Sequence, residues 1–244
     1  KKEIVKIRGI QIENVEMKKE SLAALFAIFL TGSVNNSSTI FDFDNANLCG
    51  EGITWLAKLV DVSVEMNMFY LRKNRIDSME SARCLSRALK SHTVINQLHL
   101  THCDLGSNPE ILLVILQSDV EGIDLSNNNI DSLGAVKIAE YLESDPPIGH
   151  INLEHNLLND NDAILISQAM RRNTNLRSLH LEWNNFTSIG VKALLTCVFD
   201  SSSLNAISES NHTLKEMKIF SLATSFPSLQ GCIENLLELD RTQK

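Results

Sequence analysis

The stretches IGHINLEHNLL at residues 148–158 and LRSLHLEWNNF at residues 176–186 repeat one pattern of apolar residues. Both fit the frame L-x-x-L-x-L-x-x-N/C-x-L, and so do four further segments, of which the first is the weakest and has Ala46 at position nine. The ninth positions are 46, 74, 103, 128, 156 and 184, so the steps between copies are 28, 29, 25, 28 and 28 residues. This regular period predicts a solenoid whose units stack on one another.

Each copy predicts a short strand followed by a turn and a helix. Two apolar residues flank one polar residue, which is the alternation of a strand with one buried face. The Asn at position nine follows the strand, where its amide can satisfy backbone groups of the turn, and Cys103 is a small thiol at the same position. Apolar spacings of three and four predict helices. We expect these at 52–59, 79–89, 135–142, 164–170 and 190–195.

This combination resembles the ribonuclease-inhibitor type of leucine-rich repeat, whose long units carry a full helix. The resemblance covers residues 38–222. It implies a right-handed α/β horseshoe solenoid with a parallel sheet on the concave side and helices on the convex side. It does not imply a particular ligand, because this architecture serves many partners. A second resemblance, to algal proteins of this repeat class, rests on residues 203–214 and 236–241.

We predict a single domain with three parts. Residues 1–38 form an N-terminal cap coil, residues 39–199 the regular repeats, and residues 200–244 an irregular last coil with a C-terminal capping helix. The unit before residue 128 is three residues short and contains Pro109, so its helix should be short and begin near that proline.

The two ends are predicted from shorter patterns. Ile7, Ile10 and Ile12 indicate a strand, and residues 21–30 an apolar helix that is too short to cross a bilayer, which needs about twenty residues. At the other end we expect a strand at Leu214, Met217 and Ile219. A polar-faced helix at 227–239 would then cover the open edge of the solenoid.

The charge of the chain limits the classes of molecule that it is expected to bind. Its 22 basic and 30 acidic residues give a net charge of −8, and no basic run is longer than two residues. Nucleic-acid binding is therefore not expected, because it relies on a clustered positive field. An acidic solenoid favours basic or neutral protein surfaces, so we expect a protein partner.

The cysteines bear on the compartment. The five cysteines fall at positions of the repeated apolar pattern or in the cores of predicted helices, and they show no C-x-x-C spacing. We therefore predict that they are buried thiols in a protein of a reducing compartment. The chain is thus expected to be intracellular, with the cytoplasm favoured and an organelle interior open. Four Asn-x-Ser/Thr triplets are expected by chance in this Asn-rich and Ser-rich chain. The cysteines are Cys49, Cys84, Cys103, Cys197 and Cys232.

Candidate binding residues lie at strand positions predicted to face solvent on the concave side. A Trp there exposes a large apolar area, which interfaces favour. The alternative is that Trp183 packs under the irregular coil at 200–213, whereas Trp55 has apolar helical spacing and should be core. The first candidate patch is Trp183, His180, His155, Glu154, Glu182 and Asp124. The second patch, basic and aromatic, is Tyr70, Arg72 and Lys73 with Met68.

Metal binding and catalysis are not expected at this surface. Five of the seven histidines lie on the predicted face, and His155, His180 and Glu154 could approach a zinc site, but polar residues occupy this face in any case. No Gly-rich phosphate loop, Gly-x-Ser-x-Gly motif or pocket of paired carboxylates is found. We therefore predict no metal, no cofactor and no enzymatic activity.

The sequence favours a non-catalytic scaffold or accessory subunit that binds a partner protein through the concave face. One alternative is a GTPase-activating regulator, because Ran GTPase-activating proteins share this repeat type; Arg72 or Arg75 would then act on the nucleotide. The chain lacks the acidic tail in which those proteins resemble one another. Another alternative is the sensor domain of a larger receptor.

Overall fold

The structure is a computed structural model, and the chain divides into two compact units, Lys1–Asn128 and Asn129–Lys244. The repeated pattern runs through both units. The described residues are 5–6, 9–30, 34–35, 40–62, 66–91, 95–200, 202 and 210–219.

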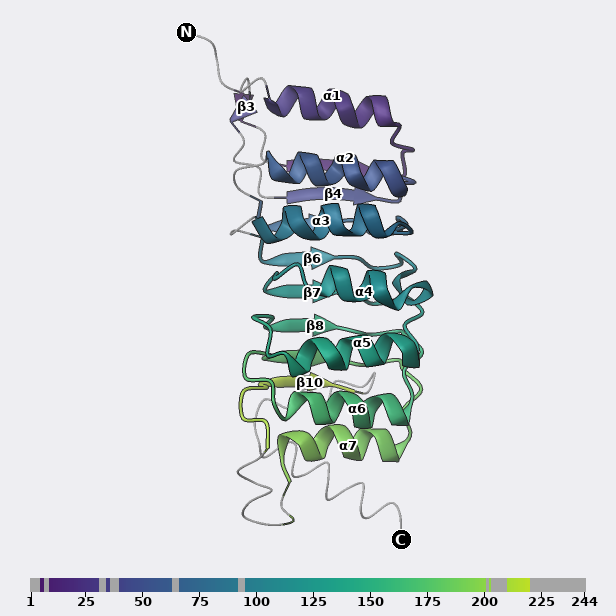
Figure 1. The fold of residues 1–244 in the computed structure, drawn as a ribbon, viewed down its shortest axis with the longest axis vertical. Helices are drawn as coiled ribbons and strands as arrows, with labels where there is room; N and C mark the ends of the chain where they lie inside the picture. The colour runs from purple at the N-terminus through teal and green to yellow at the C-terminus, as the bar shows by residue number, and fades with distance from the viewer. Residues whose placement is uncertain are drawn as a thin grey trace. The chain divides into compact units, whose positions relative to one another are not determined.

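The first unit has a layer of parallel strands and a layer of helices (Figure 1). The described strands of its main sheet pair in chain order and are β2 (Gly9–Glu13), β4 (Ile40–Asp44), β5 (Met68–Tyr70), β6 (Gln97–His99) and β7 (Gly122–Asp124). Each helix packs against the next. The helices are α1 (Lys19–Leu30), α2 (Gly50–Asp61), α3 (Met79–Ser91) and α4 (Pro109–Leu116), with a 3-10 turn at Leu105–Ser107. A separate parallel pair joins β1 (Val5–Lys6) to β3 (Val34–Asn35).

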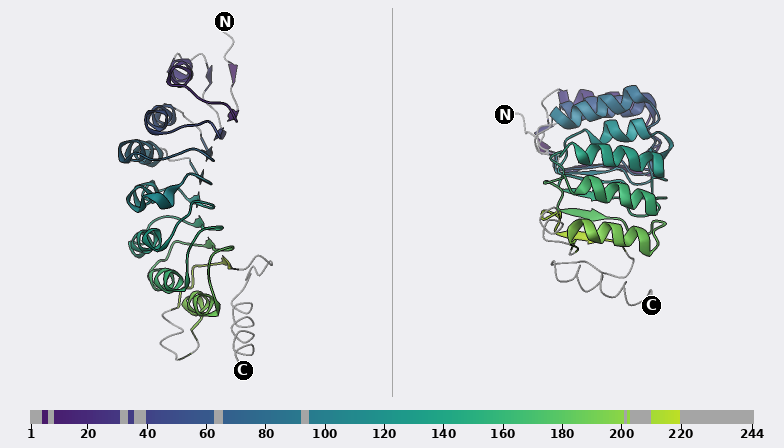
Figure 2. Two further views of the ribbon diagram at one scale, coloured as in Figure 1. Left: turned by 90° about the vertical axis from the view of Figure 1, so that its right-hand side faces the viewer. Right: turned by 60° about the horizontal axis from the view of Figure 1, so that its bottom comes forward.

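The second unit repeats this arrangement. Its described strands are parallel and are β8 (His150–Asn152), β9 (Ser178–His180) and β10 (Glu216–Lys218). Its described helices are α5 (Ser132–Glu143), α6 (Asp160–Met170) and α7 (Ser188–Val198). Figure 2 shows the helices of each unit end-on, with the strands on the other side of the repeat. We call the sheet surface turned away from the helices the open face.

The predicted α/β class, with parallel strands on one side and helices on the other, is confirmed. Each helix predicted within the described residues is present and extends beyond its predicted bounds at one or both ends. The prediction for Pro109 is confirmed as well, because it takes the first position of α4. The side chain of Asn108 accepts hydrogen bonds from the amides of Glu110 and Ile111, which are the donors that a helix leaves without partners. At eight residues, α4 is shorter than the 11 to 13 residues of the other helices after β4, because its unit is shorter.

The core lies between the two layers and is formed by the apolar ladder. Leu153 and Leu181 have no exposed surface, and Asn128 at position nine is equally buried. The amide of Asn128 accepts a hydrogen bond from the backbone N–H of Cys103 (2.8 Å) and donates one to the carbonyl of Leu100 (2.8 Å). The position-nine Asn therefore ties its own turn to the preceding coil, as a buried bend requires.

Three predictions of core positions are wrong. Cys49 is exposed because it is the N-cap residue of α2, and Cys84 is only half-buried. The buried side of α3 includes Ser81, Ala82 and Leu85, so Cys84 lies at its edge. Trp55 is also half-buried: it lies on the outer side of α2, where its ring packs edge-on against Phe26 of α1 with centroids 5.9 Å apart.

Some predictions concern residues outside the described ranges. These are the strand position of Ile7, the capping helix at 227–239, the location of Cys232 and the segment 236–241. The predicted strand at Ile10 and Ile12 is confirmed as β2, and the predicted final strand is confirmed as β10. The division into a cap, regular repeats and an irregular end stays a prediction.

Candidate functional site

The open face presents side chains in register. In the first unit the parallel pairing aligns Asp42 with Tyr70, Tyr70 with His99, and His99 with Asp124. In the second unit it aligns Asn152 with His180, and His180 with Lys218. Equivalent positions of neighbouring strands lie about 4.8 Å apart, so side chains from consecutive coils can contact one another.

One position of this face has a special backbone conformation in every coil where it is described. The residue before position nine is left-handed, with φ between 51° and 59°. Asn tolerates this conformation, whereas a bulky side chain pays a cost of about 1–2 kcal/mol. Lys73 and Trp183 are the largest departures from Asn. The residues are Asn14, Asn45, Lys73, His102 and Asn127 in the first unit, and His155 and Trp183 in the second.

Trp183 and His155 form an exposed aromatic pair in the second unit. Their rings are stacked, with centroids 5.2 Å apart and planes 7° apart, and 59% of Trp183 is exposed. The backbone N–H of His155 donates to the carbonyl of Glu182 (2.9 Å), which fixes one coil against the next. The expected exposure of Trp183 is therefore found in the structure.

His180 lies beside this pair in a polar cluster. Its Nδ1 is 3.6 Å from a carboxylate oxygen of Glu154, and its Nε2 is 3.6 Å from a carboxylate oxygen of Glu216 and 3.2 Å from the hydroxyl of Ser178. Burial, and then the positive charge of Lys218, lower the pKa of His180 despite the acidic neighbours. The neutral imidazole is therefore favoured.

Ser178 and Glu216 were not among the sequence candidates. The Ser178 hydroxyl donates to Glu216 (3.1 Å), and Lys218 lies 3.4 Å from the same carboxylate. Burial alone would raise the pKa of Glu216, but the Ser178 hydrogen bond and then the charge of Lys218 outweigh burial and lower it. Each of them begins its strand, two positions before His180 or Lys218, so the two-residue alternation of a strand could have identified both as residues of the open face.

The second candidate patch contains the predicted aromatic and basic groups, but its charges are paired. Tyr70 stacks on His99 with centroids 4.3 Å apart and planes 11° apart, and the guanidinium of Arg72 lies 5.1 Å from the Tyr70 ring centroid. Arg72 also contacts both carboxylate oxygens of Asp42, at 3.0 and 3.2 Å, and Asp44 at 3.5 Å. The patch is therefore not a free basic surface.

The remaining groups of this patch follow the same pairing. The ammonium of Lys73 lies 3.7 Å from Asp44, and the Tyr70 hydroxyl donates to the sulfur of Met68 at 3.3 Å. Burial raises the pKa of Asp42 even though Arg72 opposes this. Burial of the Asp42 carboxylate therefore outweighs the stabilisation that Arg72 gives to its charged form.

Asp124, the remaining candidate, lies in the first unit. Its carboxylate is 3.4 Å from Nδ1 of His99 and accepts the backbone N–H of Ser126 (2.9 Å). Burial alone would raise the pKa of Asp124, but the hydrogen bonds from His99 and Ser126 lower it overall. Its described hydrogen bonds are thus with His99, which stacks on Tyr70, and with Ser126.

The next features concern metal binding, thiol reactivity and membrane insertion. Within the described residues, no group of three or more His, Cys, Asp or Glu side chains is placed to hold a metal ion. Burial raises the pKa of Cys103 to about 12, so its thiolate is strongly disfavoured. The described helices also include none that is long and apolar enough to span a membrane.

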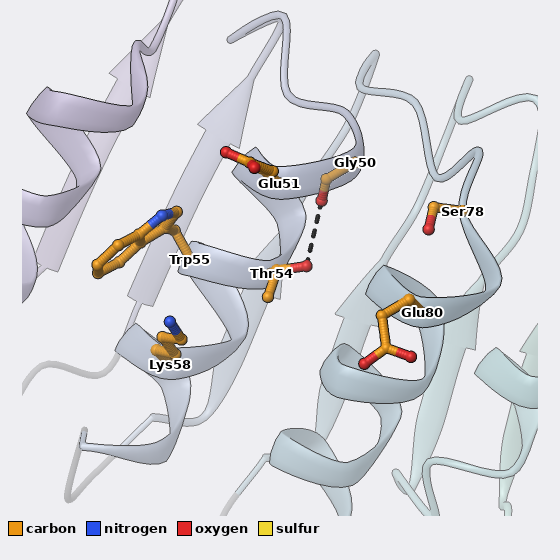
Figure 3. A pocket seen from close by; sticks show the side chains of 7 residues that line it. All are labelled: Gly50, Glu51, Thr54, Trp55, Lys58, Ser78 and Glu80. Atoms are coloured by element: carbon orange, nitrogen blue, oxygen red, sulfur yellow. Dashed lines mark hydrogen bonds between the residues drawn. The ribbon is translucent and has the colours of Figure 1, made fainter.

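The helical side of the first unit carries a hollow of about 520 Å³ between α2 and α3 (Figure 3). Trp55 and Lys58 lie on its α2 side, with the ammonium 4.2 Å from the Trp55 ring centroid. Ser78 and Glu80 lie on its α3 side. The hydroxyl of Thr54 on α2 donates to the backbone carbonyl of Gly50 (3.3 Å), as the dashed line in Figure 3 marks.

Comparison with known proteins identifies the repeat. A family model described as Leucine Rich repeat matches residues 121–139 and 172–195. No curated protein sequence matches the chain significantly. Among solved structures, actin-binding site 2 of leiomodin-1 aligns with a TM-score of 0.46 at 18% identity, over 68% of this chain and 91% of that one.

Two bacterial structures also align. The leucine-rich repeat-containing protein LegL7 of Legionella pneumophila has a TM-score of 0.46 at 15% identity, over 89% of this chain and 76% of that one. Internalin C2 of Listeria monocytogenes has a TM-score of 0.36 at 16% identity, over 82% of this chain and 83% of that one.

Proposed function

We propose that the chain is a leucine-rich repeat protein, which the family match at residues 121–139 and 172–195 supports. We further propose that it is a non-catalytic scaffold or accessory subunit that binds a partner protein through its open sheet face. The observation that carries this proposal is the exposed stack of Trp183 on His155. Aromatic side chains that bury a large area are the residues most enriched at binding hot spots.

The backbone supports the same conclusion. Trp183 has a φ of 58° at a position where Asn14, Asn45 and Asn127 show the residue that the conformation favours. A bulky side chain at a left-handed position with 59% of its surface exposed contributes little to the core. We infer that its contribution is made to a bound partner.

The proposed binding residues form two sets. In the second unit they are Trp183, His180, His155, Glu154 and Glu182. In the first unit they are Tyr70, Arg72, Lys73 and Asp124. We further propose that the chain acts inside the cell without a cofactor, and that its repeats are of the ribonuclease-inhibitor type, which the long helices support. The likeness of residues 203–214 and 236–241 to algal proteins would place it in that subgroup.

The test begins with affinity purification from the native source and mass spectrometry, followed by calorimetric titration with the purified partner. Trp183→Ala should weaken binding by about 2 kcal/mol, which is about 30-fold. Trp183→Asn should do the same while retaining a residue suited to the left-handed backbone. The matched control is Ile189→Ala, which removes a 62% exposed apolar side chain from α7.

The outcome separates the two faces of the repeat. Binding weakened by Ile189→Ala, with both Trp183 variants at wild-type affinity, would place the partner on the helices and contradict the proposal. The GTPase-activating alternative receives no support from the contacts, because Arg72 is engaged by Asp42 and Asp44. A single-turnover GTPase assay tests it directly.

A further inference from the structure

His180 lies between carboxylates of the two neighbouring coils in the second unit. Its Nδ1 is 3.6 Å from a carboxylate oxygen of Glu154, which follows β8, and its Nε2 is 3.6 Å from a carboxylate oxygen of Glu216 on β10. The hydroxyl of Ser178, on the same strand as His180, lies 3.2 Å from Nε2. The imidazole therefore faces an acidic group at each of its two nitrogens.

The two charge states of this ring differ in the hydrogen bonds that they can donate. A neutral imidazole carries one N–H group, so it can donate to the carboxylate of only one of the two coils, whereas the imidazolium carries two and can donate to both. Hydrogen bonds between an ionised donor and an ionised acceptor are also the shorter and stronger ones. Protonation of His180 would therefore draw both Glu154 and Glu216 onto the ring and connect three successive coils.

The surroundings keep the ring neutral until the pH falls. Burial, and then the positive charge of Lys218, lower the pKa of His180, although Glu216 and Glu182 oppose this. Burial alone would raise the pKa of Glu216, but its hydrogen bond from Ser178 and then the charge of Lys218 lower it, so its carboxylate stays charged while His180 titrates. The described charged groups that act on His180 come from its own coil and from the coils on either side, and they are Glu154, Glu182, Glu216 and Lys218.

A partner on the open face would make the proton on His180 more costly. Only 22% of this side chain is exposed, and a partner that covers the neighbouring Trp183 would remove more water from the ring. Loss of water disfavours the charged form of a histidine, so the complex would hold the proton less readily than the free chain does. By linkage, the affinity then falls as the pH drops through the range in which the free chain takes up the proton.

We propose that the open face of the second unit is a pH-sensitive binding surface, in which protonation of His180 holds the Glu154 and Glu216 carboxylates and releases the partner protein. This inference rests on the proposed function and specifies how that site is regulated. The complex forms at neutral pH, where the ring is uncharged. It dissociates on mild acidification, because the charged ring and the two carboxylates then serve one another instead of the partner.

The first measurement needs no partner. The chemical shifts of the ring nitrogens report protonation, so a pH titration of the full chain by NMR follows His180 directly, and its midpoint should lie below the ordinary value of 6.5. Glu154→Gln and Glu216→Gln should each lower that midpoint, because each removes a negative charge 3.6 Å from the ring, and Lys218→Met should raise it. Circular dichroism verifies that each variant is folded, and Lys218→Met carries the test if a Gln variant is not.

The second measurement uses the partner protein that affinity purification identifies. Calorimetric titration should show an affinity about threefold to tenfold lower at about pH 5.0 than at about pH 7.5. His180→Gln cannot take up the proton and should lose less than about twofold over the same interval. The matched control is His212→Gln, which replaces an exposed histidine of the same unit outside the proposed binding residues and should keep the pH dependence of the wild-type chain.

Three results would overturn the inference: a ring that stays neutral until the chain unfolds, a midpoint that a folded carboxylate variant does not lower, or an equal pH dependence of binding in His180→Gln and the wild-type chain. The proposed function is judged separately at neutral pH. If Trp183→Ala weakens the complex there while acidification does not, the scaffold function stands and the pH-sensitive surface is excluded. If Trp183→Ala leaves the affinity unchanged, the proposed function fails and the inference fails with it.

Discussion

Replacing Asn74 by Ala should destabilise the first unit by about 2–4 kcal/mol. Asn74 is 4% exposed, and its side-chain oxygen accepts the backbone N–H groups of Ala46 (3.1 Å) and Leu48 (2.9 Å). Both residues are buried, at 0% and 1% exposure, so their amides would lose their partner. Each buried polar group left without a partner costs about 1–3 kcal/mol, and water entering the vacated space should recover part of that.

Two of the carbonyls that Asn74 also serves contribute less to this loss. Its side-chain amide donates to the carbonyls of Phe43 (2.5 Å), Leu71 (3.2 Å) and Arg72 (3.0 Å). Leu71 also accepts from the thiol of Cys103 (3.1 Å), and Arg72 from the backbone N–H of Asn45 (2.9 Å). These two carbonyls each keep a second donor, so the expected cost comes mainly from the two amides and the carbonyl of Phe43.

The matched variant is Asn74→Cys, because Cys103 shows that a thiol fits this position and donates to a carbonyl. Sulfur is a weak acceptor, so the amides of Ala46 and Leu48 would be only partly served, and the loss should be about half that of Ala. Urea unfolding measures both free energies, and hydrogen exchange at these two amides reports local opening. A loss below about 0.5 kcal/mol for Asn74→Ala would refute the role of the position-nine residue.

Further predictions concern the second unit. Leu181→Ala should cost about 2–5 kcal/mol in urea unfolding, because the side chain is fully buried and leaves a cavity. Because the folded-state pKa of His180 is lowered from 6.5, the unfolded chain takes up a proton first; stability should fall as the pH drops below about 6.5, and His180→Gln should flatten this part of the melting-temperature profile. Trp183→Asn should be more stable than Trp183→Ala by about 0.5–1 kcal/mol, since Asn tolerates a φ of 58° better, and equal urea midpoints would contradict this.

Much of the fold could be predicted because each repeat is specified locally. The apolar ladder fixes which strand face is buried, and a period close to 28 residues fixes the number of units. Pro109 and Asn108 are one example: a proline after a capping residue predicts a helix start from two adjacent positions. Such signals do not depend on where distant parts of the chain lie.

The wrong predictions of burial concern residues at the edge of the buried face of a helix. Cys84 follows apolar spacing on α3, but the buried side of that helix is narrower than the pattern suggested. Trp55 is large enough to contact Phe26 and still remain partly exposed. The position of a residue in a periodic pattern predicts its face but does not give its depth.

The candidate sites show a different limit. The sequence identified Arg72 and Lys73 as a basic patch, yet Asp42 pairs with Arg72 from 30 residues away, one coil earlier. Ser178 and Glu216, which are 38 residues apart, meet through the pairing of β9 and β10. These contacts follow from the register between coils, which sets charge pairing and could have been applied once the period was known.

The register also explains why stability and recognition can vary separately in this protein. Position nine faces inward, and its residue is Asn in four copies, Cys103 in one and Ala46 in the weakest; where it is Asn, its side chain serves backbone groups of two coils. The residue before it faces outward with a left-handed backbone, and it ranges from Asn45 through Lys73 to Trp183. Asn would suit the left-handed backbone at every such position. At Lys73 and Trp183 the side chain therefore carries a conformational cost, and we infer that it has a role outside the fold. The largest exception is Trp183, which stacks on His155 and leaves 59% of its surface exposed, and this is why we propose that this coil recognises the partner.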